Sequence, residues 1–308
     1  MDLQIDNRAV LEYLQAHSSN LNLPNPKSVS INKFQDGQSN PTYLLDYGTT
    51  KVVLRKAPPG TLLKGAHQVD RESQLMQAIK VANPSCPVPN IFAIEQNTNI
   101  LGTKFFIMEY VEGNIYRDPS LLELRKEMRF AAYVGLATAL ASIHDTPLDT
   151  VLQLSNVKSA PTDSASYCRR QLSIWSRQYD GSSGDVKNLN EMRQLAQWLR
   201  ANVPRHDKSN LDSSEDLCIV HGDFRMDNVI YGNDGTVKAI LDWELSGVGD
   251  PIADLAYCCL GYYLPRVGAL ASFSLKGRHE HKFNSDDVNK LPEGIPSMEE
   301  FIEMYKAR

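Results

Sequence analysis

The octapeptide HGDFRMDN at residues 221–228 is the sequence feature that most strongly limits which folds and functions this chain can have. It follows a short apolar run, LCIV at 217–220, so its polar groups emerge where a predicted strand ends. Asp223 and Asn228 stand five residues apart within it. A further acid, Asp242, ends the segment AILD after a tight Asn-Asp-Gly turn. The sequence therefore predicts that two carboxylates and one amide lie together on one hairpin region.

This set of groups suits phosphoryl transfer. One carboxylate orients a hydroxyl nucleophile and accepts its proton, while oxygen ligands hold Mg²⁺ on the phosphates of a nucleotide. A structural interpretation stands beside it, in which Asp223 and Asn228 only close a turn. The full pattern, with a strand before it and a hairpin ending in Asp-Trp after it, favours the chemical interpretation. For His221 itself we expect an architectural role, and we expect Trp243 to lie in the core.

Composition narrows the class of protein. The chain has 308 residues, which at roughly 150 residues per domain suggests two domains or lobes. Acids outnumber bases by 37 to 32, so the charge gives no support for a nucleic-acid-binding surface. No apolar run is long enough to span a membrane. The five cysteines form no CxxC pair, as is typical of reduced thiols. We therefore expect a soluble, cytoplasmic protein without nucleic-acid or membrane partners.

Strand and helix patterns divide the chain in two. Five strand-like segments precede residue 112, with one helical segment at 66–80 between the third and fourth. The strands are VSINKF (29–34), TYLLDYG (42–48), KVVLRKA (51–57), PNIFAIEQ (89–96) and KFFIMEYV (104–111). Helical spacing then predominates over 120–145, 162–179 and 188–202. The first of these helices is predicted to bury one face, formed by Phe130, Val134, Ala137, Ala141 and His144. We expect an α+β fold with a nucleotide-binding lobe at 1–111 and a larger, mostly helical catalytic and substrate lobe at 112–308.

Several stretches resemble one known family. They are INKFQDGQSNPTYLL, VVLRKAPPGTLLKGAHQVDRE, FIMEYVEG, IVHGDFRMDNVIY and ILDWELSGVGDPIADLAY. Together they resemble the aminoglycoside phosphotransferase and choline kinase group, and most closely the domain found at the N-terminus of some acyl-CoA dehydrogenases. The resemblance covers roughly residues 30–300. It implies a protein-kinase-like fold with a small five-stranded antiparallel sheet plus a helix and a larger helical lobe.

The resemblance also implies roles for individual residues. Asp223 matches the catalytic aspartate, and Asn228 and Asp242 match the two magnesium ligands. The nucleotide-covering loop falls at Gly37, Gln38, Ser39 and Asn40. The hinge segment, whose backbone would hydrogen-bond adenine, corresponds to Glu109 to Val111. The alternative interpretation of these residues is a strand followed by a linker.

Glu72 matches the glutamate on the small-lobe helix. Its place between Val69 and Met76 on one helical face supports this independently, because an inward carboxylate needs a cationic partner. Arg55 is the candidate partner, and here the chain departs from the family, which usually has lysine at this position. Lys56 is one residue out of register. Arg55 is therefore either a phosphate ligand or a purely structural partner of Glu72.

The expected function is that of an ATP- and Mg²⁺-dependent enzyme, a small-molecule kinase that phosphorylates a hydroxyl group. The resemblance points to a hydroxyacyl-CoA as acceptor and to a functional link with a separate acyl-CoA dehydrogenase. The alternative is a nucleotide-binding pseudokinase with a regulatory or scaffold role. Two further acids have structural expectations: Asp250 as a helix N-cap before Pro251, and Asp254 as a brace of the catalytic loop.

Overall fold

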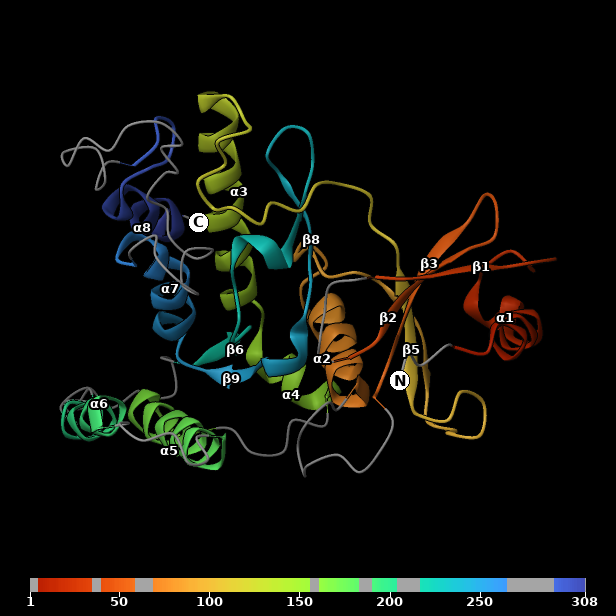
Figure 1. The fold of residues 1–308 in the computed structure, drawn as a ribbon, viewed down its shortest axis with the longest axis horizontal. Helices are drawn as coiled ribbons and strands as arrows, with labels where there is room; N and C mark the ends of the chain where they lie inside the picture. Colours follow the sequence, from red (N-terminus) through yellow and green to blue (C-terminus); the bar gives the residue numbers. More distant parts are fainter. Residues whose placement is uncertain are drawn as a thin grey trace.

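The computed structural model describes residues 5–34, 40–58, 69–155, 161–182, 190–203, 217–264 and 291–307. A five-stranded antiparallel sheet forms the first layer, in the order β1-β2-β3-β5-β4. Its strands are β1 (Ser30–Lys33), β2 (Thr42–Asp46), β3 (Lys51–Lys56), β4 (Ile91–Glu95) and β5 (Phe105–Glu109). Figure 1 shows this sheet on the right of the molecule, with most of the helices on the left.

Two helices cover opposite faces of the sheet. Because successive side chains of a strand point to opposite faces, Val52 and Leu54 of β3 pack with helix α1 (Asn7–Leu21). Val53, between them, packs with helix α2 (Val69–Ala82) instead. The same alternation sends Arg55 toward α2 and Lys56 to the other face of the sheet. There Lys56 Nζ donates to Leu101 O at 2.7 Å.

The rest of the described chain is mainly helical, with two short strand pairs near the centre. Strand β6 (Cys218–Val220) pairs with β9 (Gly247–Gly249), and β7 (Val229–Tyr231) pairs with β8 (Val237–Ile240). The helices are α3 (Lys126–His144), α4 (Leu148–Leu154), α5 (Ser164–Ser182), α6 (Asn190–Ala201), α7 (Pro251–Cys259) and α8 (Met298–Lys306). Single 3₁₀ turns lie at Met226–Asn228, Trp243–Leu245 and Leu260–Tyr262. None of the helices within the described ranges is long and apolar enough to cross a lipid bilayer.

One large hydrophobic cluster joins the two parts. It runs from Val53 and Phe106 of the sheet through α2 to α3, and on to the fully buried Trp243. The backbone also connects the parts, because Asn114 pairs with Tyr231 in an isolated bridge just after β5. The division of the chain at residues 111 and 112 stays a prediction.

The helix pair α5–α6 lies apart from this core. Figure 1 shows the two helices side by side at the lower left of the molecule. None of the described side chains of α6 is buried, and Trp175 of α5 and Trp198 of α6 are both more than half exposed. A cavity lies between this helix pair and the core and is lined by residues of both.

The α+β, kinase-like fold expected from the sequence is confirmed, and so are most of the elements. Asp250 caps α7, with its carboxylate accepting from Ile252 N at 2.9 Å. The expected inward face of α3 is wrong at its first position, because Phe130 is 46% exposed. The buried side chains of α3 centre on Tyr133, Leu136, Leu140 and Ile143, which form a neighbouring face of the helix. Strand β9 was not expected, since GVG has no strand pattern of its own.

Candidate active site

The HGDFRMDN loop is held by a buried acid from another element. Asp254 of α7 accepts from His221 N at 2.5 Å and from Gly222 N at 2.8 Å. Gly222 has φ of +84°, a conformation that side-chain-bearing residues rarely adopt. A Cβ at this position would also lie 2.8 Å from Leu245 O. The expectation that Asp254 braces the loop is therefore confirmed.

His221 stabilises the loop through hydrogen bonds to its backbone. It is fully buried, its Nε2 lies 2.9 Å from Leu241 O, and its Nδ1 lies 3.3 Å from Asp223 N. Because Nδ1 accepts the amide proton of Asp223, Nε2 carries the proton that is donated to Leu241. Burial lowers the pKa of His221, which keeps the ring neutral. The architectural role expected for this residue is confirmed.

The two carboxylates and the amide of the sequence pattern lie together. Asn228 Nδ2 donates to Asp223 Oδ2 at 3.1 Å and to Asp223 O at 2.8 Å. Leu241 N donates to Asn228 O at 2.8 Å, which places Asp242 next to this pair. The side chains of Asp223 and Asp242 are 27% and 31% exposed, so both are open to a ligand from solvent. Asp242 has φ of +64° and directly precedes the 3₁₀ turn at Trp243–Leu245.

Arg55 joins the sheet to this group. Its Nε lies 3.1 Å from Glu72 Oε2, and its Nη2 lies 2.6 Å from Asp242 Oδ1 and 3.6 Å from Glu244 Oε2. The ion pair with Glu72 agrees with the sequence analysis, whereas the contacts to Asp242 and Glu244 were not foreseen. Lys56 lies on the opposite face of the sheet, so Arg55 is the cation that β3 offers to this site.

Burial shapes the protonation of the Arg55–Glu72 pair. Glu72 is 3% exposed, and burial raises the pKa of its carboxyl to about 7. Arg55 opposes this shift, and the charges of Asp242 and Glu244 add to it. For Arg55, burial favours the neutral form, but the three surrounding carboxylates outweigh it and raise the pKa. The guanidinium therefore stays charged between several acids.

Asn40 and Glu244 form a second link between the two parts. Asn40 is 1% exposed, and its Nδ2 donates to Glu244 Oε2 at 3.0 Å. Glu244 did not emerge from the sequence analysis, although it stands two residues after Asp242 in the DWE triplet. Of the expected nucleotide-covering loop only Asn40 is described. Gly37, Gln38 and Ser39 lie outside the described residues.

The expected hinge residues occupy the end of β5. Glu109 pairs with Val52 of β3, and its side chain accepts from Asn90 N and Asn90 Nδ2 at 3.1 and 2.7 Å. Val111 follows the strand and is partly buried. Glu109 N also donates to Asn90 O at 2.8 Å, so both the side chain and the backbone N–H of Glu109 bind the neighbouring loop.

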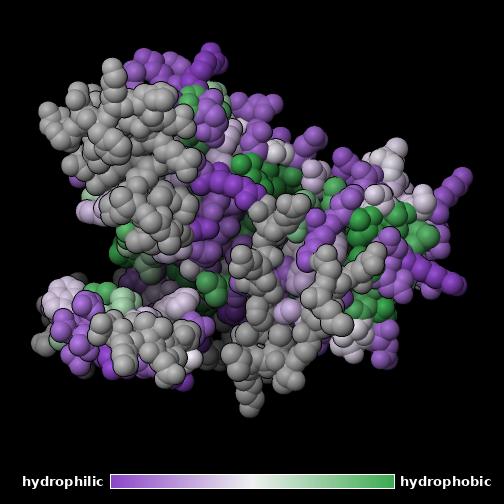
Figure 2. Space-filling model, in the orientation of Figure 1, coloured by the Kyte–Doolittle hydropathy of each residue, from purple (hydrophilic) through white to green (hydrophobic). Residues whose placement is uncertain are grey.

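A cavity of about 820 Å³ opens beside the catalytic loop. Its walls come from α5, α6, α7 and the segment after Asp242, and both Gly222 and Tyr257 line it. Burial raises the pKa of Tyr257 to about 12, and a hydrogen bond to Asp223 adds to this rise. Tyr257 therefore connects the cavity to the Asp223 carboxylate. Figure 2 shows the surface hollowed between the α5–α6 pair and the body of the molecule.

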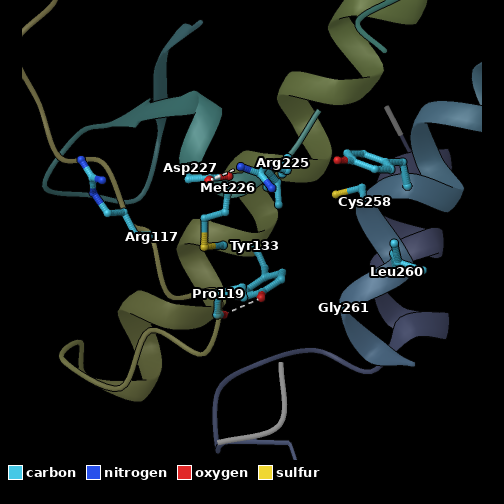
Figure 3. A pocket seen from close by; sticks show the side chains of 11 residues that line it. Arg117, Pro119, Tyr133, Arg225, Met226, Asp227, Cys258, Leu260 and Gly261 are labelled. Atoms are coloured by element: carbon cyan, nitrogen blue, oxygen red, sulfur yellow. Dashed lines mark hydrogen bonds and ion pairs between the residues drawn. The ribbon is translucent and has the colours of Figure 1, made fainter. Parts of the chain in front are cut away.

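A second, much smaller cavity lies behind the loop. Figure 3 shows Arg225 and Asp227 paired at one side of it and Cys258 of α7 at the other. Its volume is about 50 Å³, which leaves room for little more than water. The cavity beside Tyr257 is therefore the candidate site for a small-molecule ligand.

The donor set fits Mg²⁺ in its chemistry. Asn228 uses its Nδ2 in the bonds to Asp223, which leaves its Oδ1 as an oxygen donor. Asp242 accepts from Arg55 through Oδ1. Amide and carboxylate oxygens are ligands that Mg²⁺ takes together with phosphate oxygens and water. No cluster of three or more His, Cys, Asp or Glu side chains suited to a metal occurs in the part of the chain that the structure describes. Protein side chains alone therefore do not complete a metal coordination sphere among these residues.

Comparison with known proteins agrees with this geometry. A family model described as "Phosphotransferase enzyme family" matches residues 30–282. The chain is 41% identical over 275 residues to acyl-CoA dehydrogenase family member 10 of Mus musculus, covering 89% of this chain and 23% of that protein. It is 36% identical over 303 residues to acyl-CoA dehydrogenase family member 11 of Homo sapiens, covering 98% and 35%. The chain thus spans about a quarter to a third of the length of these relatives.

Solved structures share the fold. A Ralstonia eutropha protein, provisionally described as an aminoglycoside phosphotransferase, is 26% identical with a TM-score of 0.73, covering 99% of this chain and 80% of that one. The aminoglycoside phosphotransferase APH(2'')-IIa, solved with streptomycin and ATP, is 17% identical with a TM-score of 0.57. This second likeness covers 83% of this chain and 76% of that one, and at such identity it concerns the fold alone.

Proposed function

This chain belongs to the phosphotransferase enzyme family, and from that premise we propose that it transfers the γ-phosphoryl group of ATP to a hydroxyl group of a small molecule. The observation that carries the proposal is the unit formed by Asp223, Asn228 and Asp242. Asn228 donates to Asp223, and its own carbonyl is bound by the residue before Asp242. An open carboxylate and two oxygen-bearing neighbours are the parts that phosphoryl transfer needs.

In the proposed reaction Asp223 holds the acceptor hydroxyl in line with the phosphorus atom. Its Oδ2 is bound by Asn228, which fixes the orientation of the carboxylate, and its Oδ1 would hold the acceptor hydroxyl. As the bond between the acceptor oxygen and phosphorus forms, the bond from phosphorus to the β-phosphate oxygen breaks and ADP leaves, while the hydroxyl proton passes to this carboxylate. The Asp254 contacts to the loop keep Asp223 in place. Positioning supplies most of the rate, because the phosphoryl group needs little covalent help.

The nucleotide is proposed to lie between the sheet and the catalytic loop. Adenine would contact the backbone at Glu109 to Val111, and the phosphates would lie beneath the loop that ends at Asn40. Mg²⁺ held by Asn228 and Asp242 would neutralise charge on the phosphate oxygens. Arg55, anchored by Glu72, is the cation on β3 that faces this space.

For the acceptor we propose a hydroxyacyl-CoA. The names of two relatives, acyl-CoA dehydrogenase family members 10 and 11, support this class of substrate and a functional link to an acyl-CoA dehydrogenase. The cavity beside Tyr257 is large enough for an acyl chain. All five cysteines are free, which supports a reducing, cytoplasmic location.

The test is phosphoryl transfer from [γ-³²P]ATP to a panel of hydroxylated metabolites and hydroxyacyl-CoA thioesters, with and without Mg²⁺. Asp223→Asn should lower kcat by about 10²- to 10⁴-fold, because it removes the proton acceptor, while ATP affinity stays unchanged. Asp234→Asn is the matched control, since Asp234 lies in the exposed turn between β7 and β8. Near-full turnover of Asp223→Asn would show that Asp223 is not the base.

One contact favours a second candidate function. Arg55 Nη2 lies 2.6 Å from Asp242 Oδ1, so a cation of the protein already contacts a proposed metal ligand. A pseudokinase that binds nucleotide without turnover would tolerate this arrangement. Nucleotide binding that is independent of Mg²⁺, together with no transfer to any hydroxyl in the panel, would establish this alternative.

A further inference from the structure

Helix α8 packs on α3 through two aromatic contacts. Phe301 is 1% exposed, and its ring lies edge-on to the ring of Tyr133, with the centroids 6.1 Å apart. Tyr305 follows one turn later on the same face of α8 and lies edge-on to His144, with the centroids 5.6 Å apart. Figure 1 shows α8 beside α3 on the left of the molecule. The two ring pairs therefore hold α8 against α3.

The second ring pair also contains a hydrogen bond. His144 is the last residue of α3, and its Nδ1 lies 2.8 Å from Tyr305 Oη. Its Nε2 lies 3.4 Å from Asp254 Oδ2 of α7. Because a carboxylate only accepts, Nε2 carries the proton that is donated to Asp254, and Nδ1 of the neutral ring accepts. Burial raises the pKa of Tyr305 to about 12, so its hydroxyl keeps the proton that it donates to Nδ1.

Asp254 is also the acid that holds the catalytic loop. Its Oδ2 accepts from His221 N at 2.5 Å, and its Oδ1 accepts from Gly222 N at 2.8 Å. The same Oδ2 atom thus receives one donor from α3 and one from the loop. Tyr305, His144 and Asp254 therefore form a continuous hydrogen-bonded network from α8 to the backbone of the loop.

The inner part of this network is buried. The side chains of His144 and Asp254 are 5% and 2% exposed. The last torsion of an aspartate side chain has a broad energy minimum, so two backbone donors by themselves leave the carboxylate some freedom to rotate. A third donor on Oδ2 restricts this rotation, and burial leaves water little access to replace that donor. The order of the loop therefore depends on the orientation of His144.

Tyr305 selects the orientation of the His144 ring. Rotation of the ring by 180° about its last torsion would exchange nitrogen and carbon positions and remove both hydrogen bonds. The Tyr305 hydroxyl stabilises the orientation in which Nε2 is directed to Asp254. A hydroxyl on α8 thus acts on the acid that binds the loop.

We propose that Tyr305 and His144 are positioning residues of the catalytic loop, and that helix α8 controls the order of this loop through them. The word catalytic rests on the proposed phosphotransferase function, whereas the coupling of α8 to the loop stands on the contacts alone. Both side chains act through Asp254 on His221 and Gly222, the two residues that precede Asp223.

Hydrogen exchange of backbone amides, measured by mass spectrometry on the whole chain, tests the coupling without any substrate. Tyr305→Phe removes one hydroxyl and keeps the ring on His144. We expect the amides of 217–224 to exchange about three- to ten-fold faster, as the loss of one hydrogen bond allows, and those of β3 and β5 to keep their rates. His144→Leu should increase the exchange of 217–224 at least as much. Tyr305→Phe should add nothing in the His144→Leu background, because Tyr305 acts through His144.

Tyr262→Phe is the matched control. The Tyr262 hydroxyl donates to Pro296 O at 3.1 Å, directly before the N-cap Ser297 of α8. This variant therefore also removes one tyrosine hydrogen bond next to α8, but one that does not involve His144. It should leave the exchange of 217–224 unchanged. No increase in Tyr305→Phe, an equal increase in Tyr305→Phe and Tyr262→Phe, or additive increases in the double variant would overturn the proposal.

Turnover separates this inference from the proposed function. Tyr305→Phe should lower kcat for phosphoryl transfer about three- to ten-fold and leave the KM for ATP unchanged, because the loop orients Asp223 rather than the nucleotide. Faster loop exchange with an unchanged kcat would reject the positioning role. Faster loop exchange in a protein without phosphoryl transfer would support the coupling and reject the kinase. Phosphoryl transfer with unchanged loop exchange in Tyr305→Phe would reject the coupling and leave the kinase standing.

Discussion

Arg55 and Asp242 are 187 residues apart in the chain, yet Arg55 Nη2 donates to Asp242 Oδ1 at 2.6 Å. The same guanidinium binds the buried Glu72 through Nε. One side chain thus connects the sheet, helix α2 and the hairpin that carries the proposed metal ligands. Because Arg55 is itself buried, its three acidic neighbours depend on it for charge balance.

Replacing Arg55 should therefore destabilise the fold. Arg55→Met leaves Glu72 buried without its cation, and loss of one partner of a buried ion pair costs about 3–5 kcal/mol. Arg55→Lys should cost less, because an ammonium keeps the charge but cannot span both Glu72 and Asp242. Urea unfolding measures the difference. Lys56→Met is the control, since it removes only the bond to Leu101 O on the other face of the sheet. A loss in Arg55→Met no greater than in Lys56→Met would contradict this account.

Gly222→Ala should disturb the catalytic loop through two effects. The backbone φ of +84° costs an alanine about 1 kcal/mol, and its Cβ would lie 2.8 Å from Leu245 O. Gly48→Ala separates the effects, because Gly48 has φ of +90° and open space around it. We expect a larger loss of unfolding free energy in Gly222→Ala than in Gly48→Ala, and a fall in kcat in the first only. Equal losses in the two variants would mean that the Leu245 contact is relieved without cost.

Asp254→Asn should loosen the loop that carries Asp223. The carboxylate accepts from the N–H groups of His221 and Gly222, and an amide offers one oxygen to replace two. We expect a loss of about 1–3 kcal/mol in unfolding free energy and a lower kcat. Asp250→Asn on the same helix is the control, because asparagine caps a helix about as well as aspartate. A drop in stability without any change in kcat would show that Asp254 supports the helix rather than the loop.

Acid should weaken the fold through His221. Burial lowers its pKa in the folded state, whereas the unfolded chain titrates near the ordinary value of about 6.5. Below that pH the unfolded state binds more protons than the folded state, so this contribution to stability is present above about pH 6.5 and is lost as the pH falls. Urea midpoints between pH 7.5 and 5 should decline less steeply for His221→Gln than for the unchanged chain. Parallel declines would assign the acid sensitivity to other groups.

Local pattern was sufficient for much of the fold and for the centre of the site. The five strands, helix α2 and the cap at Asp250 follow from side-chain periodicity and from residues within one turn of each other. Asp223 and Asn228 lie five residues apart in one loop, so their contact is also local. For these features the backbone geometry of a few residues decides the outcome.

The sequence by itself determined the α+β architecture, the catalytic loop and the Arg55–Glu72 pairing, because each depends on short-range spacing or on a buried charge that needs a partner. Only the tertiary structure decided the contacts of Asn40 with Glu244 and of Arg55 with Asp242, and only it brought Arg71 and Arg170 to the wall of one cavity. Such pairs lie about a hundred or more residues apart, and the packing of whole elements brings them within reach. The same packing pairs GVG with β6 as strand β9 and leaves Phe130 exposed. Both outcomes depend on which elements lie next to these residues in space, and the periodicity of side chains along the chain does not specify that.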